Sequence, residues 1–434
     1  MQTTAPQQIS VAERTRRRVN RRLMPFLFAL FIVANLDRVN VGFAGLRMSR
    51  ELGFTDLVFG LGGGIFFLGY FLLEIPGTVL VEVWSARKWI CSIMVTWGLV
   101  ASATGWIHSA HQFYGLRFSL GVAEAGFFPG VVVYLSHWYR QEDRGKAVAM
   151  FMAAIPGSQV IGAPLAAALL RVHWLGFDGW RWLLTIEGAP AVVLGLITFF
   201  FLTDRPEDAK WLPAEERDWL MAELERERTA RAGHASLWRA LRSPDVLRLA
   251  AILLLGLTPN YGMSLWLPQM VQRLSALGVS QVSLIVAIPY LVSLPLMLLT
   301  GWHSDRSGER RWHTAVPRLV SGIALAACFF TTEHVWISVL LLSAATAGFY
   351  CAHPGFWPLP NLFLGRATAA ASIGLINSFG NLGGFLGPYA IGWLSSGTHS
   401  FGPGLLLMAG CALGSALLVF SLRIDPSRTA SSNR

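Results

Sequence analysis

Long apolar runs separated by short charged clusters dominate the pattern of this 434-residue chain. Each run has about 20 residues, which at 1.5 Å per residue is enough to cross roughly 30 Å of hydrocarbon as a helix. Membrane-spanning strands are shorter and alternate in hydropathy, so they do not fit. The pattern predicts an all-α membrane protein with twelve transmembrane helices, which begin near residues 24, 58, 89, 112, 146, 180, 246, 283, 314, 335, 369 and 403.

A different kind of sequence separates the sixth span from the seventh. Residues 204–245 are dense in charges of both signs, and Pro213 followed by AEERDWLMAELERER predicts a solvated amphipathic helix. We interpret this segment as a cytoplasmic linker between two six-helix bundles. The predicted parts are a basic cytoplasmic N-terminal tail, an N-terminal bundle, the linker, a C-terminal bundle and a C-terminal tail, at 1–23, 24–203, 204–245, 246–423 and 424–434.

The two halves look like copies of one unit. VEVWSARK follows the second span and GWHSDRSGERR follows the eighth, which places Glu82 against Asp305 at an offset of 223. GSQVIGAP and GFLGP align Pro164 with Pro388 at an offset of 224. Two landmarks that agree within one residue predict an internal repeat, the arrangement by which many transporters place one site between two bundles.

Composition supports a membrane protein and excludes a nucleic-acid partner. Only 14% of the residues are charged, against about 25% in soluble domains. The net charge of +10 comes from arginines and lysines in alternate connections, including six arginines before the first span. This asymmetry predicts that both termini lie in the cytoplasm, and the expected location is a bacterial-type inner membrane.

Four charged residues lie inside predicted spans, although each charge at the bilayer centre costs roughly 2.5–3.5 kcal/mol. Asp37 and Arg38 are adjacent in FIVANLDRVNVGFAG, and Arg117 and Glu124 share one helix face in FYGLRFSLGVAEAGFFPG. Such residues usually face a water-filled pathway, so we predict a functional site. Ion pairs that only hold helices together are the alternative, although buried pairs are weak evidence for stability.

Two further acids and a set of uncharged polar residues complete the candidates. Glu74, just before IPG, is expected near the inner end of its helix, and Glu187 is expected to be structural beside an interfacial anchor formed by Trp180, Arg181 and Trp182. Hydrogen-bonding side chains of the second half are candidate substrate ligands. They are Asn260, Tyr261, His353, Trp357, Asn377 and Asn381.

No motif for covalent chemistry or metal binding accompanies these residues. The sequence has no phosphate-binding P-loop, which argues against ATP as the energy source, and no cluster with metal-ligand spacing. We therefore expect no cofactor, no metal and no catalytic residue.

GWHSDRSGERR resembles the loop motif Gly-x-x-x-Asp-Arg-x-Gly of the major facilitator superfamily. The first-half copy keeps Glu82, Arg87 and Lys88, whereas Val83 and Ser85 depart from the motif. The resemblance implies a gating role for these loops. The matching second-half positions are Gly301, Asp305, Arg306, Gly308, Arg310 and Arg311.

Within that superfamily, LDRVNVGFA, GIFFLGYFLLEIPG, RFSLGVAEAGFFPG and GWRWLLTIEG resemble tartrate-transporter-like members of the anion:cation symporter family. The resemblance implies that a small organic anion, either a tartrate-like hydroxy-dicarboxylate or a sugar acid, is imported with protons by alternating access. It also implies proton-carrying acids at Asp37 and Glu124 and carboxylate-binding arginines at Arg38 and Arg117. Tyr70 matches a substrate-facing tyrosine, and Asn377 or Asn381 would bind substrate from the other half.

Electrostatics agrees with this implication. Two arginines and two ionised acids sum to zero, so a bound anion would leave excess negative charge in a low dielectric. Protonation of Asp37 and Glu124 removes that excess, and because linkage is reciprocal, protons and anion should favour each other's binding. On this interpretation Asp37 and Arg38 are a proton site and an anion site in direct electrostatic contact.

Three alternatives remain open at this point. The chain could exchange organic anions without proton coupling, act as a membrane-embedded enzyme on a lipid-linked substrate, or sense a nutrient without transporting it. The expected partners are the organic anion, protons and the lipid bilayer, and the protein is expected to act as a monomer. The sequence leaves open which organic acid is bound.

Overall fold

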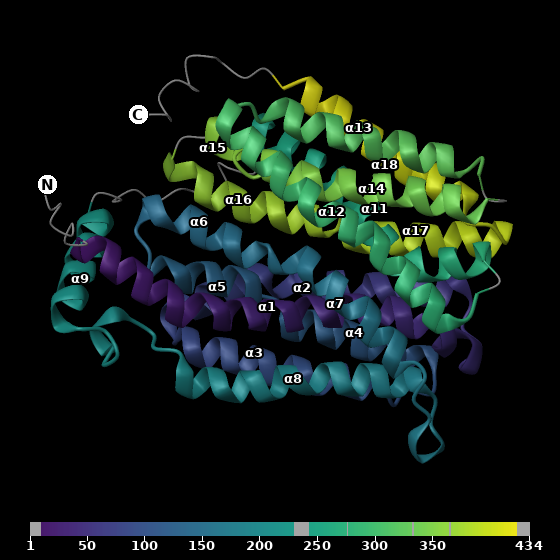
Figure 1. The fold of residues 1–434 in the computed structure, drawn as a ribbon, viewed down its shortest axis with the longest axis horizontal. Helices are drawn as coiled ribbons and strands as arrows, with labels where there is room; N and C mark the ends of the chain where they lie inside the picture. Colours follow the sequence, from purple (N-terminus) through teal and green to yellow (C-terminus); the bar gives the residue numbers. More distant parts are fainter. Residues whose placement is uncertain (1–9, 230–242, 276, 332–333, 364–365, 423–434) are drawn as a thin grey trace, which may run out of the picture.

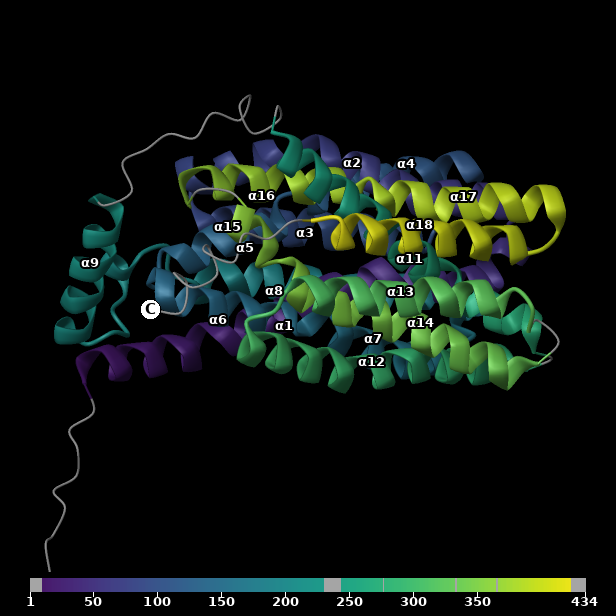
Figure 2. The same ribbon diagram turned by 90° about the horizontal axis from the view of Figure 1, so that it is seen from above.

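Helices run nearly parallel along the whole length of the molecule (Figures 1 and 2). The computed structural model describes residues 10–229, 243–275, 277–331, 334–363 and 366–422, and within these ranges it contains helices and no strand. The predicted C-terminal tail, 424–434, therefore lies outside the described residues, as do parts of the N-terminal tail and linker.

Twelve spans account for the two halves, so the all-α fold class is confirmed. Nine of the described helical segments are long and apolar enough to cross a membrane alone, and α3, α13 and the broken α16–α17 complete the twelve. The first half contains α1 (Val11–Glu51), α2 (Asp56–Val83), α3 (Ala86–Thr104), α4 (Ala110–Glu124) with α5 (Phe127–Ser136), α6 (Gln141–Met152) with α7 (Ala154–Leu169), and α8 (Gly179–Phe201). The second half contains α11 (Pro244–Leu274), α12 (Val279–Ser307), α13 (Arg311–Cys328), α14 (Val335–Phe356), α16 (Arg366–Asn381) with α17 (Gly383–Thr398), and α18 (Gly402–Phe420). Short connections form η1 (Trp174–Gly176), η2 (Pro206–Asp208) and α15 (Leu359–Phe363).

The first helix begins well before the predicted start of the first span at residue 24. Ser10 caps α1 by accepting a hydrogen bond from the backbone N–H of Glu13 (3.3 Å), and the helix then continues past Pro25. Within the predicted N-terminal tail, residues 11–23 are therefore helical and continuous with the span. We call this end of the molecule, which carries Val11 and the linker, the terminal end.

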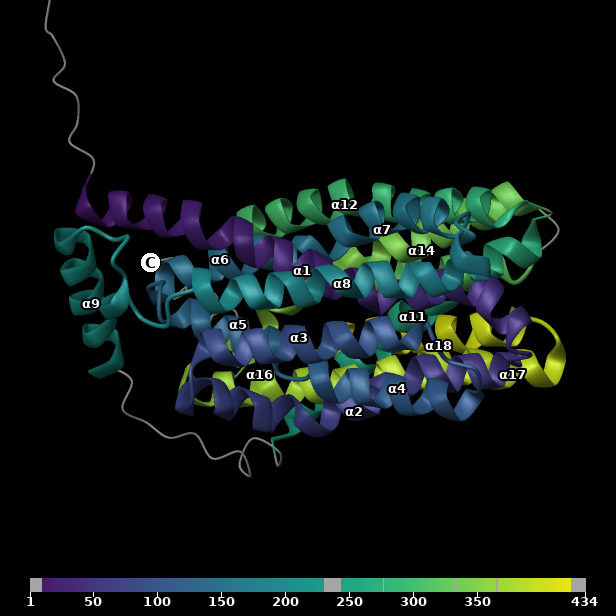
Figure 3. The same ribbon diagram turned by 90° about the horizontal axis from the view of Figure 1, so that it is seen from below.

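The linker helix α9 (Ala214–Thr229) confirms the predicted helix after Pro213. It packs beside the start of α1 (Figures 2 and 3), where Arg14 pairs with Glu215 and Arg18 with Glu216, each at 3.0 Å. One face of α9 is also buried, because Leu220 is only 2% exposed. The linker is thus attached to the first half rather than fully solvated.

The fourth predicted span, Ala110–Ser136, breaks at Gly126. This glycine has a φ of 85°, a left-handed conformation that ends α4 and starts α5. A Cβ atom there would lie 3.0 Å from the Cα of Gly77 in α2, so the close approach also requires glycine. As a result Glu124, the last residue of α4, lies at a helix end inside the membrane.

The two halves meet closely at the far end, opposite the terminal end. Asp56 at the start of α2 pairs with Arg273 of α11 (2.5 Å) and accepts a hydrogen bond from Ser395 of α17 (2.5 Å). Farther along α2, a Cβ atom at Gly60 would lie 2.5 Å from the carbonyl oxygen of Pro388. These polar and close-packed contacts close the far end between the halves.

A glycine substitution in α4 tests the packing that positions the site. A Cβ atom at Gly121 would lie 1.9 Å from the backbone oxygen of Phe66, so Gly121→Ala must push α4 away from α2. Overpacking of this kind costs about 1–3 kcal/mol, and we expect a lower thermal denaturation temperature in detergent. Gly115→Ala on the same helix is the control, because no atom lies within 4 Å of a Cβ there. Equal denaturation temperatures for both variants would contradict this packing.

Candidate functional site

A cavity of about 100 Å³ lies between the two halves. The first half contributes basic and aromatic side chains, and the second half contributes neutral polar ones. No group of His, Cys, Asp or Glu in the described part of the chain is arranged to hold a metal ion. The polar side chains around the cavity are Asn35, Arg38, Arg117, Gln159, Asn260, Tyr261, Ser264, Tyr350 and His353.

Arg38 and Glu124 form a close ion pair beside this cavity. The Nη2 and Nε atoms of Arg38 lie 2.5 and 2.7 Å from Oε1 of Glu124. The Arg38 side chain keeps 20% of its surface exposed, whereas Glu124 keeps 1%. The guanidinium of Arg38 also lies 5.2 Å from the ring centroid of Tyr70, a cation–π distance. Glu124 thus occupies the hydrogen-bonding edge that a substrate carboxylate would need.

Arg117 is more deeply buried than Arg38, at 2% exposure, and fewer of its donors form hydrogen bonds. Its Nε donates a long hydrogen bond of 3.4 Å to the carbonyl oxygen of Gly62, and its guanidinium lies 4.9 Å from the ring centroid of Phe66. Its Nη1 has no hydrogen-bond partner among the described residues. A buried cation with an unused donor on a cavity wall suits a bound anion.

Asp37 faces away from this cavity, although it neighbours Arg38 in sequence. Its carboxylate accepts hydrogen bonds from Nε1 of Trp97 (2.6 Å) and from Nδ2 of Asn40 (3.2 Å). Consecutive residues of an α-helix point about 100° apart, so the two side chains leave α1 in different directions. No hydrogen bond joins Asp37 to Arg38 among the described residues, and the Asp37 carboxylate lies within electrostatic reach of Arg117 and Glu124.

Glu187 belongs with Asp37 rather than with the interfacial residues near it in sequence. It is 4% exposed on α8 and lies within electrostatic reach of Asp37. Trp180 and Arg181, the predicted anchor, instead bind Glu51 at the far end through hydrogen bonds of 2.5 and 2.8 Å. The structural role expected for Glu187 stays a prediction.

Glu74 joins the two halves and is not at a helix end. Helix α2 continues past it to Val83, which corrects the expected position. Its carboxylate accepts hydrogen bonds from Asn377 (2.5 Å), Ser378 (2.9 Å) and Asn381 (3.4 Å) of α16. The predicted asparagine pair therefore binds Glu74 here and does not line the cavity.

The remaining predicted ligands of the second half divide into two groups. Asn260, Tyr261 and His353 line the cavity, and Nδ1 of His353 has no hydrogen-bond partner within the described ranges. Trp357 lies just beyond α14 and packs against Phe356, with ring centroids 5.7 Å apart, so it is not brought to the cavity. Sequence reasoning missed the cavity-lining polar residues Asn35, Gln159, Ser264 and Tyr350, which read individually as ordinary helix residues.

The second-half copy of the loop motif makes its contacts within its own half. Asp305 pairs with Arg310 (2.7 Å), which also donates to Ser304 (2.9 Å), while Arg311 donates to the carbonyl oxygen of Phe420. Two other members are the exposed Arg306, stacked on Trp302, and Gly308, whose φ of 67° ends α12. Gly301 lies opposite Pro354. None of these described contacts reaches the first half.

The first-half copy behaves in the same way. Arg87 pairs with Asp204 through Nε (3.3 Å), and its backbone N–H donates to the same carboxylate (2.9 Å). Glu82 lies in α2, and its side chain is outside the described residues. A latch between the halves is therefore not formed by the described motif residues in this conformation.

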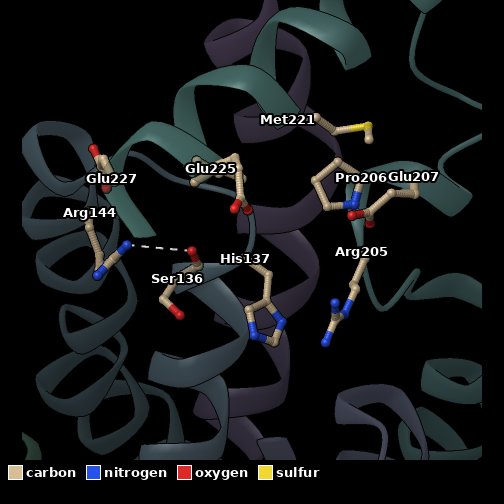
Figure 4. Close-up of a pocket in the computed structure, with 10 residues that line it drawn as sticks. Ser136, His137, Arg144, Arg205, Pro206, Glu207, Met221, Glu225 and Glu227 are labelled. Carbon is tan, nitrogen blue, oxygen red and sulfur yellow. Dashed lines mark hydrogen bonds between the residues drawn. The ribbon is translucent and has the colours of Figure 1, made fainter. Parts of the chain in front are cut away.

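A second cavity of about 360 Å³ lies at the terminal end (Figure 4). Ser136 and His137 at the end of α5, Arg144 of α6, and residues of η2 and α9 surround it. Arg144 donates a hydrogen bond to the carbonyl oxygen of Ser136 (3.4 Å). Basic and acidic side chains alternate around this cavity, so its charge selects no class of ligand.

Comparisons with known proteins agree with this architecture. The family description "Major Facilitator Superfamily" matches residues 26–388. A protein of Agrobacterium vitis, named as a candidate tartrate transporter, is 43% identical over 423 residues, which cover 97% of this chain and 96% of the relative. A quinolone resistance transporter of Acinetobacter baumannii is 38% identical over 411 residues, which cover 93% and 94%.

A solved structure extends the agreement to the fold. The D-xylose-proton symporter superposes with a TM-score of 0.73 over 94% of this chain and 98% of that chain, at 14% sequence identity. The predicted resemblance to tartrate-transporter-like proteins is confirmed by the relatives, and the predicted fold by this structure. The chain therefore belongs to the major facilitator superfamily and is a multi-pass membrane transporter of a small molecule, not an enzyme.

Proposed function

We propose that this transporter imports a small organic anion, a tartrate-like hydroxy-dicarboxylate or a sugar acid, together with protons. The observation that carries the proposal is the buried guanidinium of Arg117, which presents an unused Nη1 at the wall of a cavity between the halves. A planar guanidinium suits a carboxylate because it can donate two parallel hydrogen bonds. The 43% identity to a candidate tartrate transporter supports the same class of substrate.

The Arg38–Glu124 pair supplies a mechanism of coupling. While Glu124 is ionised, its Oε1 occupies both Nη2 and Nε of Arg38. A proton on Glu124 removes its negative charge and releases this edge of Arg38 for the substrate carboxylate. Proton and anion then bind together, because the ionised acid and the anion compete for the same guanidinium.

Asp37 contributes from a different face of α1. Its carboxylate lies within electrostatic reach of Arg117 and is held by Trp97 and Asn40. When both arginines bind an anion, an ionised Asp37 behind them adds unfavourable negative charge in a low dielectric. Asp37 is therefore the second proposed proton carrier, and its effect is transmitted by charge rather than by contact with Arg38.

The geometry also suggests how the cavity opens alternately to the two sides of the membrane. We assign the terminal end to the cytoplasm of a bacterial-type inner membrane, because six arginines precede the first span there. The far end, where Asp56 contacts Arg273 and Ser395, is then the proposed periplasmic side, and these contacts favour release of substrate inward. Return to the outward state requires these contacts to break and the halves to rock about the site. The monomer contains both halves and is the proposed functional unit.

Transport by the purified protein in proteoliposomes tests this function. An imposed proton gradient, acidic outside, should concentrate a radiolabelled hydroxy-dicarboxylate or sugar acid inside, and a protonophore should abolish the accumulation. Binding of a panel of organic acids, measured as thermal stabilisation, selects the substrate for this assay. Counterflow that persists without any proton-driven accumulation would instead assign the protein to anion exchange.

A further inference from the structure

A groove of about 640 Å³ lies at the terminal end, outside the transport cavity. Its basic wall is one face of α1, because the arginines recur at the three- and four-residue spacing of a helix face. Phe201 at the end of α8 and Trp211 before α9 form its apolar wall. The arginines are Arg14, Arg17, Arg18, Arg21 and Arg22.

Acidic side chains compensate only part of this charge. Arg14 and Arg18 pair with glutamates of α9, and Arg17 pairs with Glu13 at 2.5 Å. Arg21 is exposed, and neither it nor Arg22 pairs with an acid among the described residues. Two adjacent arginines thus remain as the uncompensated part of the groove.

Two aromatic rings hold the side chain of Arg22 in place. Its guanidinium lies 4.7 Å from the ring centroid of Phe201 and 5.0 Å from that of Trp211. Its Nε is buried and has no hydrogen-bond partner among the described residues. Stacking fixes the plane of the guanidinium and no described acid pairs with it, an arrangement in which arginine commonly recognises a phosphate.

The groove adjoins an apolar surface that suits acyl chains. Phe199 and Phe200, in the last turn of α8, are 37% and 83% exposed, as expected for side chains that face acyl chains. Phe201 follows them directly and lines the groove, while the apolar part of α1 begins at Leu23, just after the last groove arginine. A ligand with a phosphate and an acyl chain can therefore contact the arginines and this apolar surface at once.

We propose that this groove binds the phosphate of an anionic phospholipid, with Arg21 and Arg22 as its principal ligands. A basic residue near an anionic membrane surface contributes about 1 kcal/mol, and the aromatic wall favours a lipid over a free phosphate. The bound headgroup also contacts α1, α8 and the segment before α9, so it strengthens attachment of the linker to the first half.

Native mass spectrometry and thermal denaturation of the full chain test this site. In micelles supplemented with phosphatidylglycerol, the protein should retain lipid and denature at a higher temperature than with phosphatidylcholine. Removal of two charges with Arg21→Gln/Arg22→Gln should weaken phosphatidylglycerol binding about 30-fold, the equivalent of about 2 kcal/mol. Arg21→Gln alone, at an exposed position that leaves the stacking intact, should show a smaller loss.

The matched control removes the same charge elsewhere at the terminal end. Lys88→Gln/Lys146→Gln changes two exposed lysines outside the groove and should retain full phosphatidylglycerol binding. Wild-type affinity in the arginine double variant, or an equal loss in the lysine control, would overturn the site. Full stabilisation by soluble glycerol phosphate at the same concentration would overturn the lipid as its source. Anion transport assays on the same variants report separately on the transport cavity.

Discussion

Replacing Arg117 with lysine is expected to weaken binding of the transported anion about 10- to 100-fold. Lysine keeps the positive charge but lacks the planar fork, and Arg117 is the cavity arginine whose Nη1 has no partner among the described residues. Because its side chain is 2% exposed, water compensates poorly for the lost hydrogen bond. Isothermal titration of the purified variant with the anion selected in the binding panel measures the effect.

Arg318→Lys is the control for this experiment. Arg318 is equally well buried, at 3% exposure, but it donates to the carbonyl oxygen of Ile252 (2.9 Å) and to Ser415 and does not line the cavity. Its substitution should lower thermal stability without changing anion affinity. If Arg117→Lys binds as tightly as the parent protein, Arg117 does not hold the substrate carboxylate.

The second large effect is expected from neutral analogues of the proposed proton carriers. Glu124→Gln and Asp37→Asn resemble the protonated acids, so they should still bind and exchange the anion across the membrane. They should not concentrate it under a proton gradient, and the inside-to-outside ratio should remain about one, because a proton is no longer loaded and released in each cycle. Counterflow and proton-driven uptake by the same proteoliposomes separate the two properties.

A purely structural role of these acids predicts a different result. Breaking a buried ion pair costs about 3–5 kcal/mol, so Glu124→Gln would then fail to fold or would lose all transport. Glu51→Gln provides the comparison, since Glu51 pairs with the buried Arg181 (2.8 Å) at the far end and should not affect coupling. Well-folded Glu124→Gln and Asp37→Asn variants with parental proton-driven accumulation would exclude both acids as carriers.

The sequence predicted the fold because each span carries its own signal. Twenty apolar residues must cross a bilayer as a helix, whatever packs around them. The break at Gly126 and the early start of α1 at Val11 were missed, since the first depends on the close approach of α2 and the second on pairing with α9. Hydropathy contains neither of these tertiary contacts.

The candidate site was predictable in composition but not in its pairings. Arg38, Arg117 and Glu124 stood out because charge inside a span is costly; the two arginines line the cavity, and Glu124 pairs with Arg38 beside it. The adjacency of Asp37 and Arg38 in sequence did not reveal that the helix turns the Asp37 carboxylate toward Trp97. The contact of Glu74 with Asn377 joins residues 303 positions apart, so no local pattern could reveal it.

The length of α1 has a practical consequence for observing transport. Its 41 residues form one unbroken helix of about 60 Å, which carries Arg38 at the cavity and the attachment of α9 at the terminal end. Because α1 joins the linker helix α9 to the first half, α9 moves when the first half tilts. A label on α9 therefore reports this tilt. Energy transfer from a fluorescent donor on α9 to an acceptor attached at the exposed position of Arg306 would therefore follow the transport cycle. Neither label touches the binding cavity.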